Sequence, residues 1–459
     1  MKLRLGIDVA CRAAHQASCA DDTGRFLWSG HRFRTDPDEL DALWAKLPAD
    51  GEVEVTVIME PTRNAWVPLA AWFRRHGAVV VMVPPEQSAD LRDYYNKHAK
   101  SDRLDSKVLA RLPLLHPEGV TIEAGIGPGD ALKRAVKIRS GLVHRRTTSM
   151  QRLDCLLELM GPAWVAALGS DMCKTSFRFL ARYANPHTVR HLGQRRLGEF
   201  LHRSSRGAWA GERATEILAA AKTTIALWGD EFDFDELAAD IAAEARLALV
   251  VCDEIAAMDK RIAALYTTAD PAGIVRSAPG VGVIGAPQIL GRLGDAHRFR
   301  NLAGVRSFSG LVPRRDDSGH IAIAGGPTKA GDACLREALF ISADHARKID
   351  PTLAQRYHRL MTVEGKHHNS ALCHIATVLL TRIAACLRAG GTYQLVDIDG
   401  TAITEVQGRA IVTGRYTIPT ATRAARRTTT TTSRQPRRNE RANKGVGKRS
   451  ETPLVPTPA

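Results

Sequence analysis

The sequence predicts an α/β domain at the N-terminus, a helical or coiled-coil middle, and a mostly α-helical C-terminal domain followed by a disordered basic tail. Three observations predict this order. Short apolar runs alternate with helical patterns up to about residue 124, helical spacing dominates to about residue 392, and Arg, Thr and Pro are frequent thereafter. We therefore expect domains at 1–124, 125–268 and 269–392, with the tail at 393–459.

The elements of the N-terminal domain are predicted from their apolar periodicity. Strand signals lie at 3–9, 25–32, 53–59 and 78–83, and helical patterns lie at 36–47, at 64–76 and in the residues up to about 115. The strand–helix–strand unit in this order predicts a sheet whose central strands are buried on both faces.

Carboxylates follow two of the predicted strands. Asp8 lies near the end of the first strand, and Glu60 directly follows the run that ends at Met59. Because ligand sites in open α/β sheets form at the carboxyl ends of the strands, we expect both acids at one edge. A charged carboxylate at the end of a buried strand is costly unless it is paired, so this edge is a candidate binding site.

Two further carboxylates, Asp102 and Asp105, lie three residues apart on a predicted helix that opens at Ser101. This spacing places both on one helix face, and like charges so close favour a divalent cation between them. Taken alone, the pattern favours a structural interpretation, in which Ser101 and Asp102 cap the helix and Asp105 complements its dipole. Together with Asp8 and Glu60, it predicts a site for one or two metal ions in phosphoryl transfer.

The middle domain is predicted to be almost wholly helical. Residues 132–159 form a basic helix, and residues 233–266 carry a regular apolar seam. Such a seam fits a long hairpin or a coiled coil, and equally a helical bundle within one chain. The segment between these helices carries exposed-type arginines, which fit a nucleic-acid surface or an ordinary solvated face. These arginines are Arg190, Arg195, Arg196, Arg203 and Arg206.

The C-terminal domain begins with the glycine-rich segment 277–285. Its glycines match a dinucleotide-binding pattern, but the preceding residues are helical and then broken by Pro279, so no buried strand leads into them and the match is rejected. A helix-hairpin-helix-like turn fits better. There Gly280 and Gly282 would let the next helix begin with free amides that hold a nucleic-acid phosphate. A plain tight turn remains the alternative.

Ser318 lies in a predicted polar loop after Arg314 and Arg315, so we expect its hydroxyl to be exposed beside positive charge. Composition alone fits an ordinary turn. Lys329 and Arg336 follow as further candidates for nucleic-acid contact. A zinc site is rejected because the nearby ligand types match no usual spacing. Those residues are His367, His368, Cys373 and His374.

The charge balance favours a polyanionic partner such as nucleic acid. The formal net charge is +15, and twelve Lys/Arg against two Glu between Gly408 and Ala459 place ten of these charges in the tail. The eight cysteines are scattered without a CxxC pair, which fits reduced thiols in a cytoplasm. No apolar run approaches the roughly 18 residues that span a bilayer, so we expect no membrane partner.

In this order, the motifs resemble a known family. The acid spacing resembles that of RNase H-like nucleases of the Holliday-junction-resolvase type. The whole set resembles insertion-sequence transposases with an N-terminal DEDD domain and a C-terminal domain that carries a nucleophilic serine. The segments that carry the resemblance are Gly6–Asp8, Met59–Thr62, Lys100–Asp105, Ser277–Gly282, Phe308–Pro313 with Ser318-Gly319, and Lys329–Arg336.

The resemblance implies a DNA transposase guided by a structured bridge RNA. Asp8, Glu60, Asp102 and Asp105 would bind Mg²⁺ or Mn²⁺, and Ser318 would attack a DNA phosphate and hold the strand covalently. The implied partners are donor and target DNA, the guide RNA and further copies of the chain in a dimer or tetramer. The implied location is the bacterial cytoplasm, in association with the nucleoid. Two other functions stay open: a metal-dependent structure-specific nuclease that uses water, and a nucleic-acid-binding protein without enzymatic activity.

Overall fold

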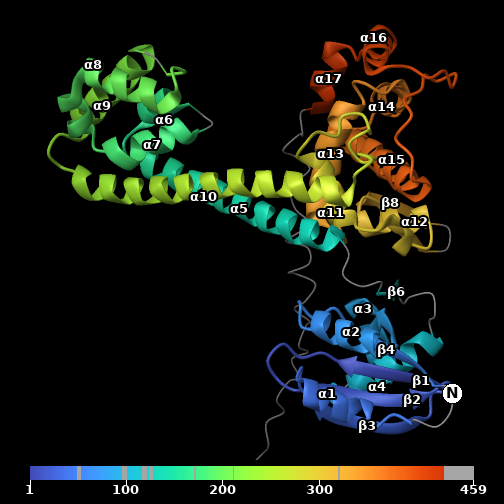
Figure 1. Ribbon diagram of the computed structural model, residues 1–459. Coiled ribbons are helices and arrows are strands. Elements are labelled where there is room, and N and C mark those ends of the chain that lie inside the picture. The colour runs from blue at the N-terminus through green and yellow to red at the C-terminus, as the bar shows by residue number, and fades with distance from the viewer. Residues whose placement is uncertain are drawn as a thin grey trace, which may run out of the picture. The chain divides into compact units, whose positions relative to one another are not determined.

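The computed structural model describes residues 1–48, 53–95, 101–115, 121–123, 128–169, 172–209, 211–318 and 321–427. The chain divides into two compact units, Met1–Pro128 and Gly129–Ala459 (Figure 1). The N-terminal unit contains β1 (Lys2–Asp8), β2 (His15–Asp21), β3 (Phe26–Phe33), α1 (Pro37–Trp44), β4 (Glu54–Met59), α2 (Trp66–Arg75), β5 (Val79–Met82), α3 (Pro85–Tyr95), α4 (Asp102–Leu115) and β6 (Thr121–Ile122).

The N-terminal unit is built on one mixed sheet with the order β3-β2-β1-β4-β5-β6. The strands β1, β4 and β5 are parallel, whereas β2 runs antiparallel to β1 and β3 antiparallel to β2. Side chains of α1 and α2 share a buried cluster with β1, and α4 shares a separate cluster with β4 and β5. Both faces of the central strands are therefore covered, as the predicted α/β class requires.

The strand β2 was not predicted from the sequence, and neither were the short β6 and the hairpin strands β7 and β8 described below. The buried residues of β2 include Ala17, Ser18, Cys19 and Ala20, so it lacks the alternation of large apolar and polar side chains that marks a strand. Ser18 faces α4, where its hydroxyl lies 2.8 Å from that of Ser106, whereas Ala17 and Cys19 belong to the buried cluster shared with α1 and α2. Because β2 is buried on both faces and its side chains are small, its sequence shows no strand alternation.

The second unit is mostly helical. Its first part contains α5 (Pro128–Glu158), α6 (Pro162–Leu168), α7 (Lys174–Tyr183), α8 (Pro186–Ser205), α9 (Gly211–Trp228) and α10 (Phe234–Ala269). Its second part contains α11 (Gly285–Leu293), η2 (Ala296–Arg298), α12 (Leu302–Ser309), β7 (Pro313–Ser318), β8 (Ile321–Pro327), α13 (Ala333–Ala346), α14 (Pro351–Thr362), α15 (His368–Ala389), α16 (Glu405–Arg415) and α17 (Thr420–Arg427).

The long helices α5 and α10 each contribute to two separate cores. Their ends near Leu153 and Leu237 join α6–α9, whereas their other ends, near Leu132 and Ile262, join the core of α11–α15. Ion pairs between Arg139 and Asp259 and between Arg152 and Glu244 show that the two helices run antiparallel. Part of the apolar seam at 233–266 is therefore buried within the chain, as the hairpin alternative predicts.

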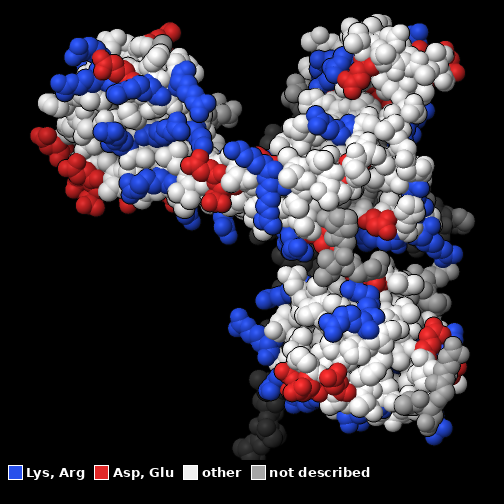
Figure 2. Space-filling model, in the orientation of Figure 1, with Lys and Arg blue, Asp and Glu red and all other residues white. Residues whose placement is uncertain are grey.

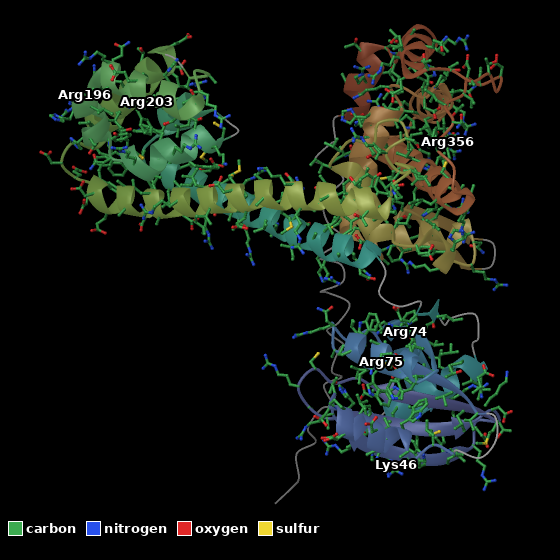
Figure 3. The ribbon with its side chains drawn as sticks, in the orientation of Figure 1. Lys46, Arg74, Arg75, Arg196, Arg203 and Arg356 are labelled. Atoms are coloured by element: carbon green, nitrogen blue, oxygen red, sulfur yellow. The ribbon has the colours of Figure 1, made fainter. Side chains whose placement is uncertain are left out.

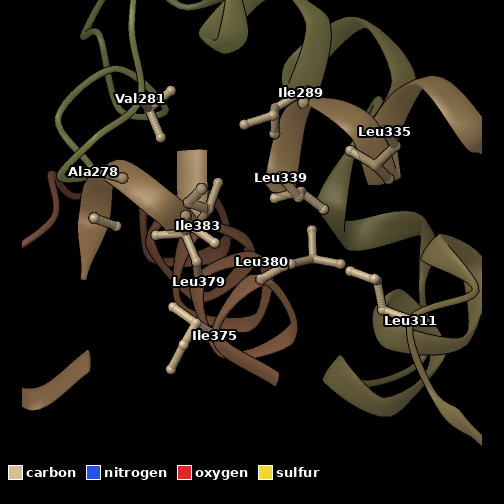
Figure 4. Close-up of a cluster of buried hydrophobic side chains, with 14 of the residues drawn as sticks. Ala278, Val281, Ile289, Leu311, Leu335, Leu339, Ile375, Leu379, Leu380 and Ile383 are labelled. Carbon is tan, nitrogen blue, oxygen red and sulfur yellow. The ribbon is translucent and has the colours of Figure 1, made fainter. Parts of the chain in front are cut away.

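The core of the second part surrounds α15 (Figure 4). Among the described residues, the helix α15 is long and apolar enough to cross a membrane, judged by length and composition alone. The sequence prediction that no segment reaches this threshold is therefore wrong. Leu372, Ile375, Leu379 and Leu380 of α15 are buried against neighbouring helices, and this burial accounts for its apolar composition.

The prediction that ordered structure ends near Gly390 is also wrong. Residues 393–427 include α16 and α17, and Ile418 is buried in the same core as α15. The backbone at Gly408 lies so close to the segment between α13 and α14 that a Cβ atom there would be 2.2 Å from the Ile349 carbonyl oxygen. The rest of the predicted tail, 428–459, lies outside the described residues.

Candidate active site

Two of the four predicted acids lie at matched ends of neighbouring parallel strands. Ile7 of β1 pairs with Met59 of β4, so Asp8 ends one strand where Glu60 follows the other. Both side chains are partly buried. The prediction that these acids share the carboxyl edge of the sheet is confirmed.

Glycine at position 6 lets α4 lie directly on β1. A Cβ atom on Gly6 would be 2.2 Å from the Ser106 carbonyl oxygen and 2.4 Å from the Ala110 amide nitrogen. Both distances are far below van der Waals contact, so no other residue fits here without a shift of the helix. The hydrogen bond between Ser18 and Ser106 fixes the same turn of α4 over β2.

The direction of α4 follows from contacts at its other end. The Leu114 side chain lies beside Gly24, where an added Cβ would be 3.2 Å away. Gly24 follows the end of β2, and β2 ends beside Leu3 at the start of β1. Hence α4 runs antiparallel to β1, and its first turn lies toward the carboxyl edge that holds Asp8.

Asp102 and Asp105 occupy this first turn. The helix is capped by Ser101, whose hydroxyl accepts a hydrogen bond from the Leu104 amide at 3.3 Å. The predicted helix start at Ser101 is therefore confirmed, and Asp102 is not required as the cap. Strands β1 and β4 and helix α4 thus direct all four predicted acids to one edge of the N-terminal unit.

Buried polar groups orient the residues around this edge. The Ser88 hydroxyl of α3 donates a short hydrogen bond to the Glu60 carboxylate, and only 6% of Ser88 is exposed. The ring of His15 accepts a hydrogen bond at Nδ1 from the Ala10 amide and bonds through Nε2 to the Thr35 hydroxyl at 2.8 Å. Burial lowers the pKa of His15, so the ring stays neutral. The sequence did not identify Ser88 or His15 as residues of this site, because their contacts are long-range or lie in loops.

The donor chemistry at this edge fits a hard divalent cation, because carboxylate oxygens are the ligands that Mg²⁺ and Mn²⁺ prefer. The side chains have not closed around a ligand position: within the described part of the chain, no group of three or more His, Cys, Asp or Glu side chains is arranged to hold a metal ion.

The predicted nucleophile lies in the second unit, at the tip of a β-hairpin. Ser318 is the last residue of β7 and pairs with Ile321 of β8, so it ends a strand rather than lying in an extended polar loop. Gly319 and the side chains of Ser318 and Arg315 lie outside the described part of the structure. The predicted exposure of the hydroxyl therefore stays a prediction.

The base of this hairpin is held rigidly against α12 and α13. Arg314 donates to the Thr328 carbonyl at 3.3 Å, and Arg336 donates to the Ser309 carbonyl at 3.2 Å. A Cβ atom on Gly331 would lie 2.4 Å from the Phe308 carbonyl oxygen, which explains glycine there. Of these two arginines, both predicted to contact nucleic acid, Arg314 donates across the base of the hairpin and Arg336 joins α13 to α12. Lys329 is exposed beside them, with a φ of 57°.

The glycine-rich segment before α11 belongs to a long connection between two helices, whereas the tight-turn alternative expects a short one. Residues 270–284, all described, separate α10 from α11, and none of them forms a strand before Gly280. With a φ of 73°, Gly280 packs against α13, where a Cβ atom would be 2.4 Å from the Ala346 amide nitrogen. The lack of a side chain at Gly280 thus permits close packing, and the predicted nucleic-acid contact at Gly280 and Gly282 stays a prediction. Gly282 lies in open space.

Two family models match this chain. A transposase model of the DEDD IS110 type matches residues 5–162, and a model described as the IS116/IS110/IS902 transposase family matches residues 272–359. The first match contains all four acids, and the second contains Gly280 and Ser318.

Proteins of three insertion elements resemble the chain over most of its length. The IS110 protein of Streptomyces coelicolor is 25% identical over 85% of this chain and 95% of the relative. The IS116 protein of Streptomyces clavuligerus is 26% identical over 84% of this chain and 95% of the relative. The IS900 protein of Mycobacterium paratuberculosis is 26% identical over 84% and 96%, respectively. Matches to both the acid-bearing and the serine-bearing regions, in this order, show that the chain belongs to the IS110 family of insertion-sequence transposases.

Proposed function

We propose that this transposase cuts and rejoins DNA through a covalent bond to Ser318, assisted by a divalent cation on the acid quartet. The observation that carries the proposal is the docking of α4 on β1 at Gly6, which directs Asp102 and Asp105 toward the edge that holds Asp8 and Glu60. Carboxylates in a first turn also complement the helix dipole, so the position of this turn beside Asp8 and Glu60 supports the metal site.

The topology of the N-terminal unit supports an RNase H-like fold. Three antiparallel strands, β1 to β3, precede two strands parallel to β1, in the order β3-β2-β1-β4-β5. In such a sheet, acids after β1 and β4 and on a helix packed across them face one substrate edge. The added strand β6 extends the far side and leaves this edge unchanged.

Asp8, Glu60, Asp102 and Asp105 would hold Mg²⁺ or Mn²⁺. When bound, the cation supplies charge neutralisation at the scissile phosphate and lowers the pKa of an attacking hydroxyl. Ser88 would keep the Glu60 carboxylate oriented through its short hydrogen bond.

The proposed step exchanges one phosphate ester bond for another, so their number stays the same. Ser318 Oγ attacks phosphorus and loses its proton, while the bond from phosphorus to one strand's oxygen breaks and that oxygen takes up a proton. One strand is then held as a phosphoserine ester and the other ends in a hydroxyl. Attack by a hydroxyl of a second strand reverses the step and joins new partners, so no external energy source is required.

Substitution of Ser318 tests the proposal. The chain is incubated with branched DNA and Mg²⁺, denatured, and analysed for labelled DNA bound to protein. We expect adducts from the natural chain and none from Ser318→Ala or Asp102→Asn. Adducts that persist in Ser318→Ala would reject the serine. Free DNA ends without any adduct in the natural chain would favour the metal-dependent nuclease.

We also propose that the chain works as a dimer or tetramer with a guide RNA. The acids and Ser318 lie in different units of the chain, so one site could combine residues of two copies. Mixing Asp102→Asn with Ser318→Ala should then restore adducts that neither variant forms alone, once subunits exchange. Sequencing of RNA that copurifies with the chain tests the guide, and recovery of unrelated RNA alone would contradict it.

A further inference from the structure

We propose that helices α7 and α8 carry a second nucleic-acid surface, an arginine face that binds the phosphate backbone of duplex DNA. This face consists of Arg178, Arg182, Arg196, Arg203 and Arg206. The choice of DNA rests on the proposed function, because a transposase must hold DNA. The existence of the surface rests on the charges and contacts of the two helices alone.

The segment that spans α7 and α8 has an unusually one-sided charge. From Lys174 to Arg206 it contains eight Lys or Arg residues and a single acid, Glu199. Lys174 pairs with Asp253 of α10. Within the described residues, the five arginines of the face form no ion pair with a carboxylate, and all five are exposed.

The register of α8 places two of its arginines, Arg196 and Arg203, on one side. Leu197 and Leu201 are fully buried in the core of α6–α9, so they mark the inner side. Arg196, Phe200 and Arg203 follow each other at spacings of four and three residues, which puts them in one row on another side. Figure 3 labels Arg196 and Arg203 on the same group of helices.

Two arginines of α7 join this row. Arg178 donates a hydrogen bond to the Ser204 carbonyl of α8 at 2.6 Å. The Arg182 guanidinium lies 6.0 Å from the ring centre of Phe200 and 5.3 Å from that of Tyr183. The two rings are 5.0 Å apart and nearly perpendicular. The arginines of both helices therefore surround one aromatic pair.

This arrangement suits phosphate better than it suits solvent alone. Uncompensated guanidinium groups repel each other, whereas phosphate oxygens accept two parallel hydrogen bonds from each. The aromatic pair holds Arg182 through cation–π contact, which reduces the entropy lost on binding. By contrast, the exposed residues of α10 include both acidic and basic side chains. Figure 2 shows the abundance of Lys and Arg on the visible side of α6–α9.

The test is DNA binding by the full chain carrying Ser318→Ala, in EDTA, with a labelled duplex of about 30 base pairs and salt varied from about 50 to 200 mM. The test variant is Arg182→Gln, Arg196→Gln, Arg203→Gln. Its matched control removes the same charge from α10, as Arg246→Gln, Lys260→Gln, Arg261→Gln. Both must keep the melting temperature of the parent chain; if the test variant does not, Arg196→Gln, Arg203→Gln replaces it with a matching two-residue control.

We expect the test variant to bind at least about tenfold more weakly, with a salt slope smaller by about one for each phosphate that is no longer neutralised. The control should stay within about twofold of the parent. Glu199→Gln should bind more tightly, because it removes the one acid beside the row. Equally weakened binding in test and control variants would reject the arginine face. An effect confined to an RNA hairpin of equal charge would reject DNA as the occupant. These binding measurements do not depend on adduct formation, which tests Ser318 separately.

Discussion

Gly6 and Ser106 approach so closely that a Cβ atom on Gly6 would lie 2.2 Å from the Ser106 carbonyl oxygen. This contact lets the first turn of α4 reach the edge that holds Asp8. Because the clash is with backbone, only a shift of α4 or β1 relieves it.

The first prediction is therefore that Gly6→Ala displaces α4 and abolishes adduct formation. We expect a loss of stability of about 1–3 kcal/mol as well, since overpacking a buried contact costs that much. Gly141→Ala is the control, because an added methyl group there meets nothing within 4 Å on helix α5. It should keep or slightly raise the melting temperature. Normal adduct yield from Gly6→Ala would show that the position of α4 does not matter for the reaction.

The second prediction concerns Ser88, which orients Glu60. Ser88→Ala removes the donor to the Glu60 carboxylate and leaves the backbone of α3 intact. Since partners of metal ligands typically contribute 10–100-fold to metal affinity, we expect about that increase in the Mn²⁺ concentration needed for half-maximal adduct formation. Glu60→Gln should show a larger loss. An unchanged metal requirement in Ser88→Ala would mean that Glu60 is not a ligand.

The third prediction concerns His15 and pH. Burial lowers the pKa of His15 in the folded chain below its ordinary value of 6.5, so the unfolded state binds the extra proton more readily. His15 therefore contributes full stability above about pH 6.5, and this contribution is lost as the pH falls through and below that value.

His15→Asn supplies a test, because its side-chain oxygen can replace Nδ1 as acceptor for the Ala10 amide without titrating. Between pH 7.5 and pH 5.5, we expect the melting temperature of the natural chain to fall further than that of the variant. Buried histidines elsewhere, such as His374, titrate equally in both proteins and cancel in the comparison. Equal shifts in the two proteins would exclude His15 as a contributor.

The acids were predictable from local pattern, but their convergence was not. Asp8 and Glu60 end apolar runs, and apolar runs of that length form buried strands. The spacing of Asp102 and Asp105 fixes a shared helix face. That this face meets β1 depends on contacts of Gly6 and Ser18 with a helix about a hundred residues away, which no local periodicity encodes.

The features that the sequence did not reveal have the same physical origin. The prediction for Gly280 concerned phosphate binding, and the local sequence could not show that its lack of a side chain permits a close contact with α13. Residues 393–427 were assigned to the tail together with 428–459, where a run of Thr lies amid Arg, Pro and Gly. The attachment of 393–427 to the folded unit includes a few separated contacts, such as those of Tyr393 and Ile418. Because composition describes the segment as a whole, it does not reveal a few contacts of this kind.

The fourth prediction tests these contacts. The Tyr393 hydroxyl donates to the Asp350 carboxylate at 2.6 Å, Arg382 donates to both groups, and only 1% of Asp350 is exposed. Burial and the Asp350 charge raise the pKa of Tyr393, so its hydroxyl remains a donor at every working pH. Loss of a hydrogen bond to a buried charge costs about 1.5–3 kcal/mol, and we expect Tyr393→Phe to lower the melting temperature by several degrees.

Truncation extends the same test. A chain that ends at residue 427 keeps α16 and α17 and should melt like the full protein, although its DNA binding should weaken because basic residues of the tail are removed. A chain that ends at residue 392 loses both Tyr393 and Ile418, exposes the apolar surface beside α14 and α15, and leaves Asp350 with fewer donors. It should melt well below Tyr393→Phe. Equal melting temperatures for the two truncated chains would show that residues 393–427 add nothing to the folded unit, and would restore the boundary that composition suggested.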